Sequence, residues 1–133
     1  MSDKVLNSNV SGNKTILIVE NEPSILSLLV PFLQKHGYTV LSAGNGIEAL
    51  NVLSKHTGPL DALITDVIMP QMGGEKLSEL ILSIYPGIKI LYMSGDKGNH
   101  IVQHSVLDPG VKFILKPFTP TELIKKMLEL LYS

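Results

Sequence analysis

The chain has 133 residues, the usual size of one domain, and its 44% hydrophobic and 17% charged residues can support a buried core. Eleven basic against twelve acidic residues give a net charge of −1, which argues against direct binding to nucleic acid. The absence of cysteine excludes disulfides, thiolate metal sites and a cysteine nucleophile. No apolar run approaches the ~18 residues of a membrane span and no signal peptide is evident, so we expect a cytoplasmic protein without membrane insertion.

The first residues differ in composition from the rest of the chain. Residues 1–13 are rich in Ser, Asn and Gly, and their apolar side chains are scattered. Such a segment buries too little surface to offset the entropy lost on ordering. We interpret it as a flexible tail or linker, and we expect residues 14–133 to form one folded domain.

Beyond the tail, short β-branched runs alternate with stretches of helical spacing. The runs are typical of strands covered on both faces, and proline or glycine often marks where the helical stretches begin or end. Thr119 and Glu122 form a capping box with Pro120 at the first helical position. The predicted strands are residues 15–19, 38–41, 60–65, 88–93 and 111–115, and the predicted helices are residues 23–36, 44–56, 75–85, 95–110 and 120–131.

This alternation predicts an α/β fold, a doubly wound parallel sheet with helices on both faces. In such folds ligands bind beyond the carboxyl ends of the strands, near the point where the strand order reverses. Polar residues that follow the strands are therefore candidates for a site. They are Glu20, Asn21, Glu22, Asp66, Ser94, Asp96 and Lys116.

Taken singly, each candidate has an ordinary explanation, because an acid after a strand is usually a turn former and a lysine is usually solvated. Together they supply acids, a hydroxyl and an ammonium, which suit a hard cation and a transferring phosphoryl group. Asp66 is the candidate nucleophile, since a carboxylate can form an acyl phosphate. Glu20 and Asn21, with Asp66, offer oxygen ligands to Mg²⁺, while Lys116 and Ser94 would contact the phosphoryl oxygens.

Four segments then carry a family resemblance: VENEP, LITDVIMPQMGG, ILYMSGD and FILKPFTPTEL. In this order and spacing they resemble the receiver domain of two-component response regulators, and the resemblance extends from Thr15 to Leu131. The MSG and LDPG segments look most similar to receivers at the carboxyl end of hybrid histidine kinases. The resemblance implies a flavodoxin-like sheet of five strands in the order 2-1-3-4-5, with five helices.

The resemblance also assigns roles to individual residues. It makes Asp66 the phosphoacceptor, Lys116 the lysine that contacts the phosphoryl group, Ser94 the switch hydroxyl and Phe113 the aromatic residue that reorients on activation. The backbone carbonyl of Ile68 would join the metal ligands. In receivers the peptide bond between this lysine and the proline that follows it is cis.

The implied function is phosphotransfer signalling. A histidine kinase or a histidine phosphotransfer protein would donate a phosphoryl group to Asp66 in the presence of Mg²⁺. Phosphorylation would then change the surface formed by residues 95–110, 111–115 and 120–131. We therefore expect a signalling acceptor and not an enzyme.

Three residues depart from the family pattern. Asn21 stands where receivers usually have a second acid, so we expect weaker Mg²⁺ binding. Asp96 replaces a frequent aromatic residue and places a carboxylate beside the site. The apolar side chain of Ile68 is expected to shield an acyl phosphate from water, and to tune its lifetime more strongly than Asp96.

Other interpretations remain open. The chain could be an interaction module of the same fold that no longer depends on phosphorylation, and Asn21 is the main support for this reading. A haloacid dehalogenase would need a second Asp where Ile68 stands, and a cap domain for which there is no room. A flavodoxin-like FMN carrier would need a phosphate-binding loop where the acidic ENEP segment would repel phosphate.

Overall fold

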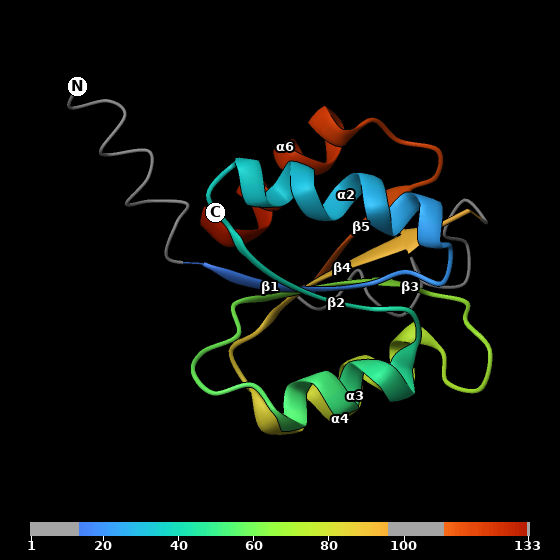
Figure 1. The fold of residues 1–133 in the computed structure, drawn as a ribbon, viewed down its shortest axis with the longest axis vertical. Helices are drawn as coiled ribbons and strands as arrows, with labels where there is room; N and C mark the ends of the chain where they lie inside the picture. Colours follow the sequence, from blue (N-terminus) through green and yellow to red (C-terminus); the bar gives the residue numbers. More distant parts are fainter. Residues whose placement is uncertain (1–13, 96–110, 133) are drawn as a thin grey trace.

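The computed structural model describes residues 14–95 and 111–132, which contain five strands and four helices (Figure 1). The predicted helix over residues 95–110 lies, except for Gly95, outside the described residues, as do Asp96 and the predicted tail. The other four predicted helices and all five strands are confirmed. In chain order the elements are β1 (Thr15–Val19), α2 (Pro23–Lys35), β2 (Thr39–Ala43), α3 (Gly46–Ser54), β3 (Ala62–Asp66), α4 (Gly74–Ile84), β4 (Lys89–Ser94), β5 (Val111–Leu115) and α6 (Pro120–Tyr132).

The strands form one parallel sheet in the order β2-β1-β3-β4-β5, as predicted. The chain runs from β1 outward to β2 and then returns past β1 to β3. This reversal makes β1 and β3 neighbours, and their carboxyl ends diverge into connections on opposite faces of the sheet. A polar site at this point follows the general rule for doubly wound sheets.

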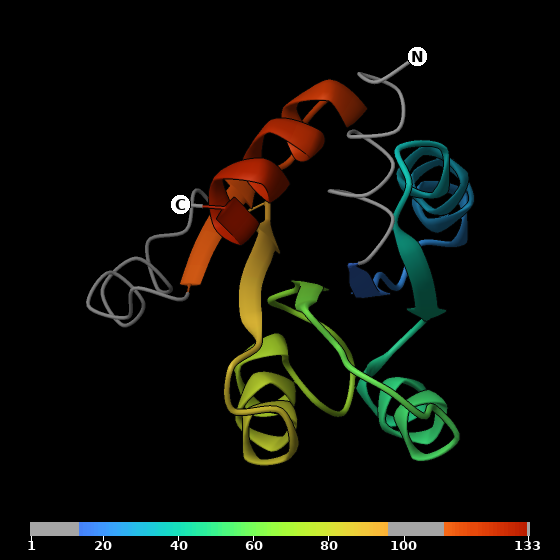
Figure 2. The same ribbon diagram turned by 90° about the vertical axis from the view of Figure 1, so that its left-hand side faces the viewer.

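Two helices cover each face of the sheet (Figures 1 and 2). Helices α2 and α6 pack on one face with Ile16 and Ile18, whereas α3 and α4 pack on the other with Leu17 and Val19. All five residues of β1 are buried, which explains why this strand is a continuous apolar run without polar alternation. Among the described residues no helix combines the length and apolar character needed to cross a bilayer.

Two element boundaries matter for the site. Strand β3 begins two residues later than predicted and includes Asp66, which we had placed just beyond the strand. Asp66 pairs with Met93 of β4, and the N–H of Val67 donates to the carbonyl of Met93 at 3.1 Å. The hydrogen bonds to β4 therefore fix the position of the Asp66 backbone. This pairing continues one residue beyond the strand end that the sequence predicted.

The predicted capping box at the start of α6 is confirmed. The N–H of Thr119 donates to Glu122 Oε1 at 2.7 Å, and the N–H of Glu122 donates to Thr119 Oγ1 at 3.1 Å. These reciprocal bonds satisfy backbone donors that a helix start leaves without intrahelical partners. They fix the start of α6 a few residues beyond Lys116.

Candidate functional site

The carboxyl ends of four neighbouring strands bring the predicted polar residues together. Glu20 follows β1, Asp66 ends β3, Ser94 ends β4 and Lys116 follows β5. The N–H of Lys116 donates to the carbonyl of Ser94 at 2.8 Å, so the ladder between β4 and β5 extends to the lysine. Parallel pairing thus places residues from distant parts of the sequence at one edge.

The ammonium of Lys116 lies between two buried carboxylates. Its Nζ is 2.7 Å from Asp66 Oδ1 and 2.8 Å from Glu20 Oε1. Only 1% of Glu20 and 3% of Asp66 are exposed to solvent. Since two carboxylates face one ammonium, the cluster keeps an excess negative charge that suits an incoming cation.

Burial and these ion pairs shift two pKa values. Burial raises the pKa of the Glu20 carboxyl above its ordinary value of 4.5, and although hydrogen bonding to Lys116 opposes this rise, it does not cancel it. Burial also pushes the pKa of Lys116 down, but its bonds to Asp66 and Glu20 outweigh that effect and raise it above 10.5. Lys116 is therefore a firmly protonated cation at neutral pH.

The loop after β1 wraps around the same carboxylates. The backbone N–H of Asn21 donates to Asp66 Oδ2 at 3.2 Å, and the N–H of Glu22 donates to Glu20 Oε2 at 2.9 Å. A cavity of about 80 Å³ opens beside them, and the residues that line it include Asn21, Asp66, Ser94 and Lys116. The cavity is small and polar enough for an ion with a few waters.

The donor set fits Mg²⁺. Two carboxylates and one side-chain amide provide the hard oxygen atoms that this ion prefers, and each carboxylate oxygen has lone pairs beyond those used by its present donors. Glu20, Asn21 and Asp66 would hold the ion, and Ile68, whose backbone carbonyl the resemblance adds to the ligands, lines the same cavity. Among the described residues no group of three or more His, Asp or Glu side chains could hold a metal ion, so an ion here would depend on two carboxylates together with amide, backbone and water oxygens.

The other residues predicted for the site lie at its border or outside it. Ile68 lines the cavity but remains 75% exposed, so its side chain borders the site and does not cover it. Phe113 lies in β5 opposite Tyr92 of β4 and packs partly against the core under α3 and α4. The peptide bond between Lys116 and Pro117 is cis, as the resemblance implied.

Sequence reasoning missed the close contact between α4 and the Asp66 backbone. The N–H of Gly74, the first residue of α4, donates to the carbonyl of Val67 at 2.7 Å. A Cβ on Gly74 would overlap the carbonyl oxygen of Asp66. The Gly-Gly pair at residues 73–74 was the available signal, since glycine often marks a close approach of two backbone segments.

A buried hydrogen-bond chain between β4 and α4 was also missed. The hydroxyl of Tyr92 donates to Ser78 Oγ at 2.8 Å, and the hydroxyl of Ser78 donates to the carbonyl of Gly74 at 2.7 Å. The chain ties the start of α4 to the strand that carries Ser94. No local pattern in the sequence pairs a tyrosine on a strand with a serine on the preceding helix.

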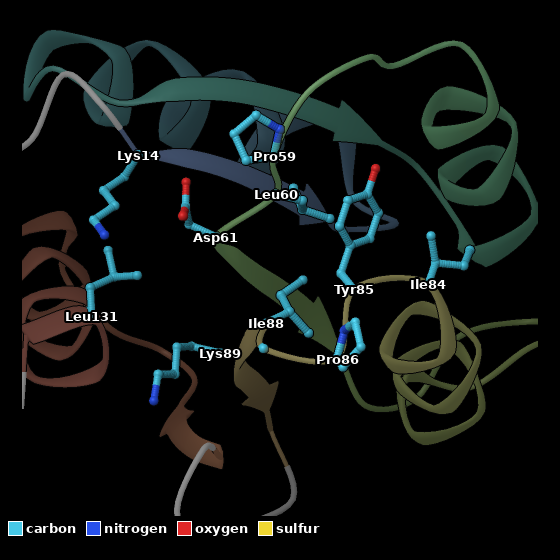
Figure 3. A pocket seen from close by; sticks show the side chains of 11 residues that line it. Lys14, Pro59, Leu60, Asp61, Ile84, Tyr85, Pro86, Ile88, Lys89 and Leu131 are labelled. Carbon is cyan, nitrogen blue, oxygen red and sulfur yellow. The ribbon is translucent and has the colours of Figure 1, made fainter.

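A larger cavity of about 390 Å³ lies at the opposite, amino-terminal edge of the sheet (Figure 3). Its charged residues have structural roles, because Asp61 Oδ2 accepts the backbone N–H of Thr15 at 2.8 Å and the Lys14 ammonium lies 5.5 Å from the centre of the Tyr132 ring. Much of the remaining lining in Figure 3 is apolar and includes Leu60, Ile88 and Leu131. The carboxyl edge is therefore the better candidate for chemistry.

Comparison with known proteins identifies the family of the chain. Residues 16–128 match the family model of the response regulator receiver domain. The chain belongs to this family. The predicted resemblance to receivers is thus confirmed over nearly the same span of sequence.

The chain is similar to parts of kinases and to response regulators. The sensor kinase CckA of Brucella abortus is 34% identical over 125 residues, which cover 92% of this chain but 13% of that kinase. A solved receiver domain from the hybrid histidine kinase CckA is 31% identical, with a TM-score of 0.68 and coverage of 88% of this chain and 98% of that one. The response regulator TrrA of Thermotoga maritima, solved in complex with Mg²⁺-BeF, is 31% identical, with a TM-score of 0.72 and coverage of 89% and 99%.

Proposed function

We propose that this receiver accepts a phosphoryl group on Asp66 from a phosphohistidine of a histidine kinase or histidine phosphotransfer protein. The observation that carries the proposal is the Lys116 ammonium, 2.7 Å from Asp66 Oδ1 at the edge of a polar cavity that Ser94 also lines. The Asp66 carboxylate, the Lys116 ammonium and Ser94 thus border the same cavity. The similarity to TrrA supports extending Mg²⁺ to this chain.

In the proposed transfer a carboxylate oxygen of Asp66 attacks the phosphorus atom of the phosphohistidine. The new oxygen–phosphorus bond forms as the phosphorus–nitrogen bond breaks, and the imidazole nitrogen leaves with the electron pair and takes a proton. Lys116 and Ser94 hold the phosphoryl oxygens in place. Bound Mg²⁺ would supply further neutralisation of charge on these oxygens.

The acyl phosphate changes the partners of Lys116. Once an Asp66 oxygen carries the phosphoryl group, the carboxylate charge is lost and the ammonium pairs better with the phosphoryl oxygens, while Glu20 remains beside it. Ser94 is drawn to the same oxygens from the end of β4. Because β4 pairs with β5, where Phe113 lies opposite Tyr92, the population shifts toward a second arrangement of the surface around β5 and α6.

The protein in this proposal is a stoichiometric acceptor in the cytoplasm and not an enzyme. Its partners are the phosphoryl donor and whatever protein recognises the altered surface, and nucleic acid is not a direct partner. The alternative function, an interaction module independent of phosphorylation, draws on Asn21, which replaces a charged metal ligand with a neutral one.

Intact-mass measurement after incubation with acetyl phosphate and Mg²⁺ tests the proposal. We expect the wild type to gain the mass of one phosphoryl group and Asp66→Asn to gain none. Asp61→Asn makes the same chemical change at the opposite edge of the sheet and should label like the wild type. Labelling of Asp66→Asn would refute the assigned residue, and a wild type that never labels would favour the phosphorylation-independent module.

A further inference from the structure

Hydrogen-bond matching assigns the side-chain amide of Asn21 with its nitrogen toward the two carboxylates. In this orientation Nδ2 donates to Asp66 Oδ2 at 2.9 Å and to Glu20 Oε2 at 3.3 Å. Without a cation between the groups, the reverse orientation would set the amide oxygen against two carboxylates, acceptor against acceptor, which hydrogen-bond matching disfavours. In this cation-free arrangement Asn21 is therefore a donor, and its amide has to turn over before it can supply the oxygen ligand described above.

The carboxylates of Glu20 and Asp66 are consequently bridged on two sides. Lys116 contacts Glu20 Oε1 and Asp66 Oδ1, and the Asn21 amide contacts the other oxygen of each group. The backbone N–H of Asn21 adds a third donor, to Asp66 Oδ2. An amide can join two carboxylates in this way without adding charge, whereas an aspartate at residue 21 would add a third negative charge to the cluster.

We propose that Asn21 is a positioning residue that locks the carboxylates of Glu20 and Asp66 together, and that its amide must turn over before a divalent cation binds. The amide N–H groups and a cation need the same carboxylate oxygens, so the two arrangements exclude one another. Turning the amide replaces a donor with an oxygen ligand, as metal coordination requires. Only the choice of Mg²⁺ as the cation rests on the proposed function. The lock itself depends on contacts within the folded chain.

The lock has two consequences that oppose one another. It stabilises the fold when divalent cations are scarce, because paired buried carboxylates cost less than unpaired ones. It also raises the cation concentration at which the site fills, because binding has to break the contacts that Asn21 makes. Asn21 thereby sets the Mg²⁺ concentration at which the site fills.

Thermal melting in EDTA and in saturating Mg²⁺ tests the lock through three variants. In EDTA we expect Asn21→Asp to lower the melting temperature by about 4 °C or more and Asn21→Ala by about 2 °C or more. Asn51→Asp makes the same charge change at an exposed position of α3 and should shift it by less than about 2 °C. In Mg²⁺, Asn21→Asp should show the largest rise in melting temperature and bind Mg²⁺ on the order of tenfold more tightly than the wild type.

Nuclear magnetic resonance of the side-chain amides gives a direct readout of the turnover. The Asn21 amide protons should exchange slowly with solvent in EDTA and faster when Mg²⁺ is bound, whereas those of Asn51 should not change. Equal melting of wild type and Asn21→Ala in EDTA would overturn the lock. Mg²⁺ binding that leaves the Asn21 amide signals unchanged, or no Mg²⁺ binding by either wild type or Asn21→Asp, would overturn the competition with the cation.

These measurements separate the lock from the proposed function, because none of them requires phosphotransfer. A protein that shows the melting and exchange effects but never labels with acetyl phosphate supports the lock and contradicts phosphorylation of Asp66. If the wild type labels normally with acetyl phosphate but has the same melting temperature in EDTA as Asn21→Ala, the lock is contradicted and phosphorylation of Asp66 is not.

Discussion

Gly74 lies directly against the backbone of Asp66, with no room for a side chain between them. A Cβ on Gly74 would overlap the Asp66 carbonyl oxygen and come within 3.1 Å of Val67 Cα. The first turn of α4 therefore supports the backbone of Asp66, the proposed phosphoacceptor, and of the loop that carries Ile68. A methyl group added at Gly74 should shift the backbone of Asp66, because two closely packed backbone segments leave no free space for it.

We predict that Gly74→Ala destabilises the protein by about 1–3 kcal/mol, since the added methyl group forces α4 and β3 apart. It should also slow labelling by acetyl phosphate, because Asp66 and Ile68 move with their backbone. Urea unfolding and the time course of mass gain measure the two effects. Gly87→Ala is the matched control, as a Cβ there meets no atom within 4 Å. Equal stability of the two variants would contradict the contact.

A second prediction concerns the hydrogen bond between Tyr92 and Ser78. Tyr92→Phe should cost about 1 kcal/mol of stability, because it removes the donor to Ser78 Oγ while keeping the packed ring. Hydrogen exchange at the Gly74 amide should become faster, since Ser78 anchors the carbonyl of that residue. Tyr85→Phe, at the opposite edge of the sheet, should change neither quantity.

A double-mutant cycle tests whether the two hydroxyls act together. The double variant Tyr92→Phe with Ser78→Ala should cost less than the sum of the two single variants, because each alone removes the same hydrogen bond. Additive costs in urea unfolding would show that the residues contribute independently, and the proposed tie between β4 and α4 would then be wrong.

The third prediction is a pH dependence of stability that originates in Glu20. Burial raises its pKa above 4.5, so between 4.5 and the raised value the folded protein holds a proton that the unfolded chain has released. The contribution of Glu20 to stability therefore falls as the pH rises through this window. Urea midpoints in EDTA should show wild type losing stability relative to Glu20→Gln as the pH rises from about 4.5 to 7. Parallel profiles would contradict the assigned direction, and Glu79→Gln on the exposed face of α4 serves as the control.

The fourth prediction concerns the lifetime of the acyl phosphate. Ile68 borders the cavity and offers no hydrogen bond to an attacking water, so the phosphorylated form should persist. Ile68→Asn should shorten its lifetime several-fold by orienting a water, Ile68→Val should leave it nearly unchanged, and Asp96→Ala should have a smaller effect than Ile68→Asn. Loss of the phosphorylated mass over time measures all four proteins. A larger effect of Asp96→Ala would assign control of hydrolysis to Asp96.

The sequence alone determined the elements and the composition of the site. Apolar runs such as residues 15–19 and 60–65 predict buried strands because both faces of a parallel sheet are covered, and their alternation with helices predicts the doubly wound topology. The polar residues after the strands follow from the same topology. Asp66, Ser94 and Lys116 could therefore be assigned to one edge before any coordinates were considered.

Only the tertiary structure decided which atoms meet there. The pairing of Lys116 with Glu20, the donor role of the Asn21 amide and the approach of Gly74 to Asp66 join segments that are far apart in sequence or depend on the orientation of one side chain. Local periodicity reports which face of an element is buried, but it does not report the register and packing distances that select polar partners. For this reason the sequence predicts Asn21 only as an oxygen ligand, whereas in the fold hydrogen-bond matching makes its amide a donor to Glu20 and Asp66.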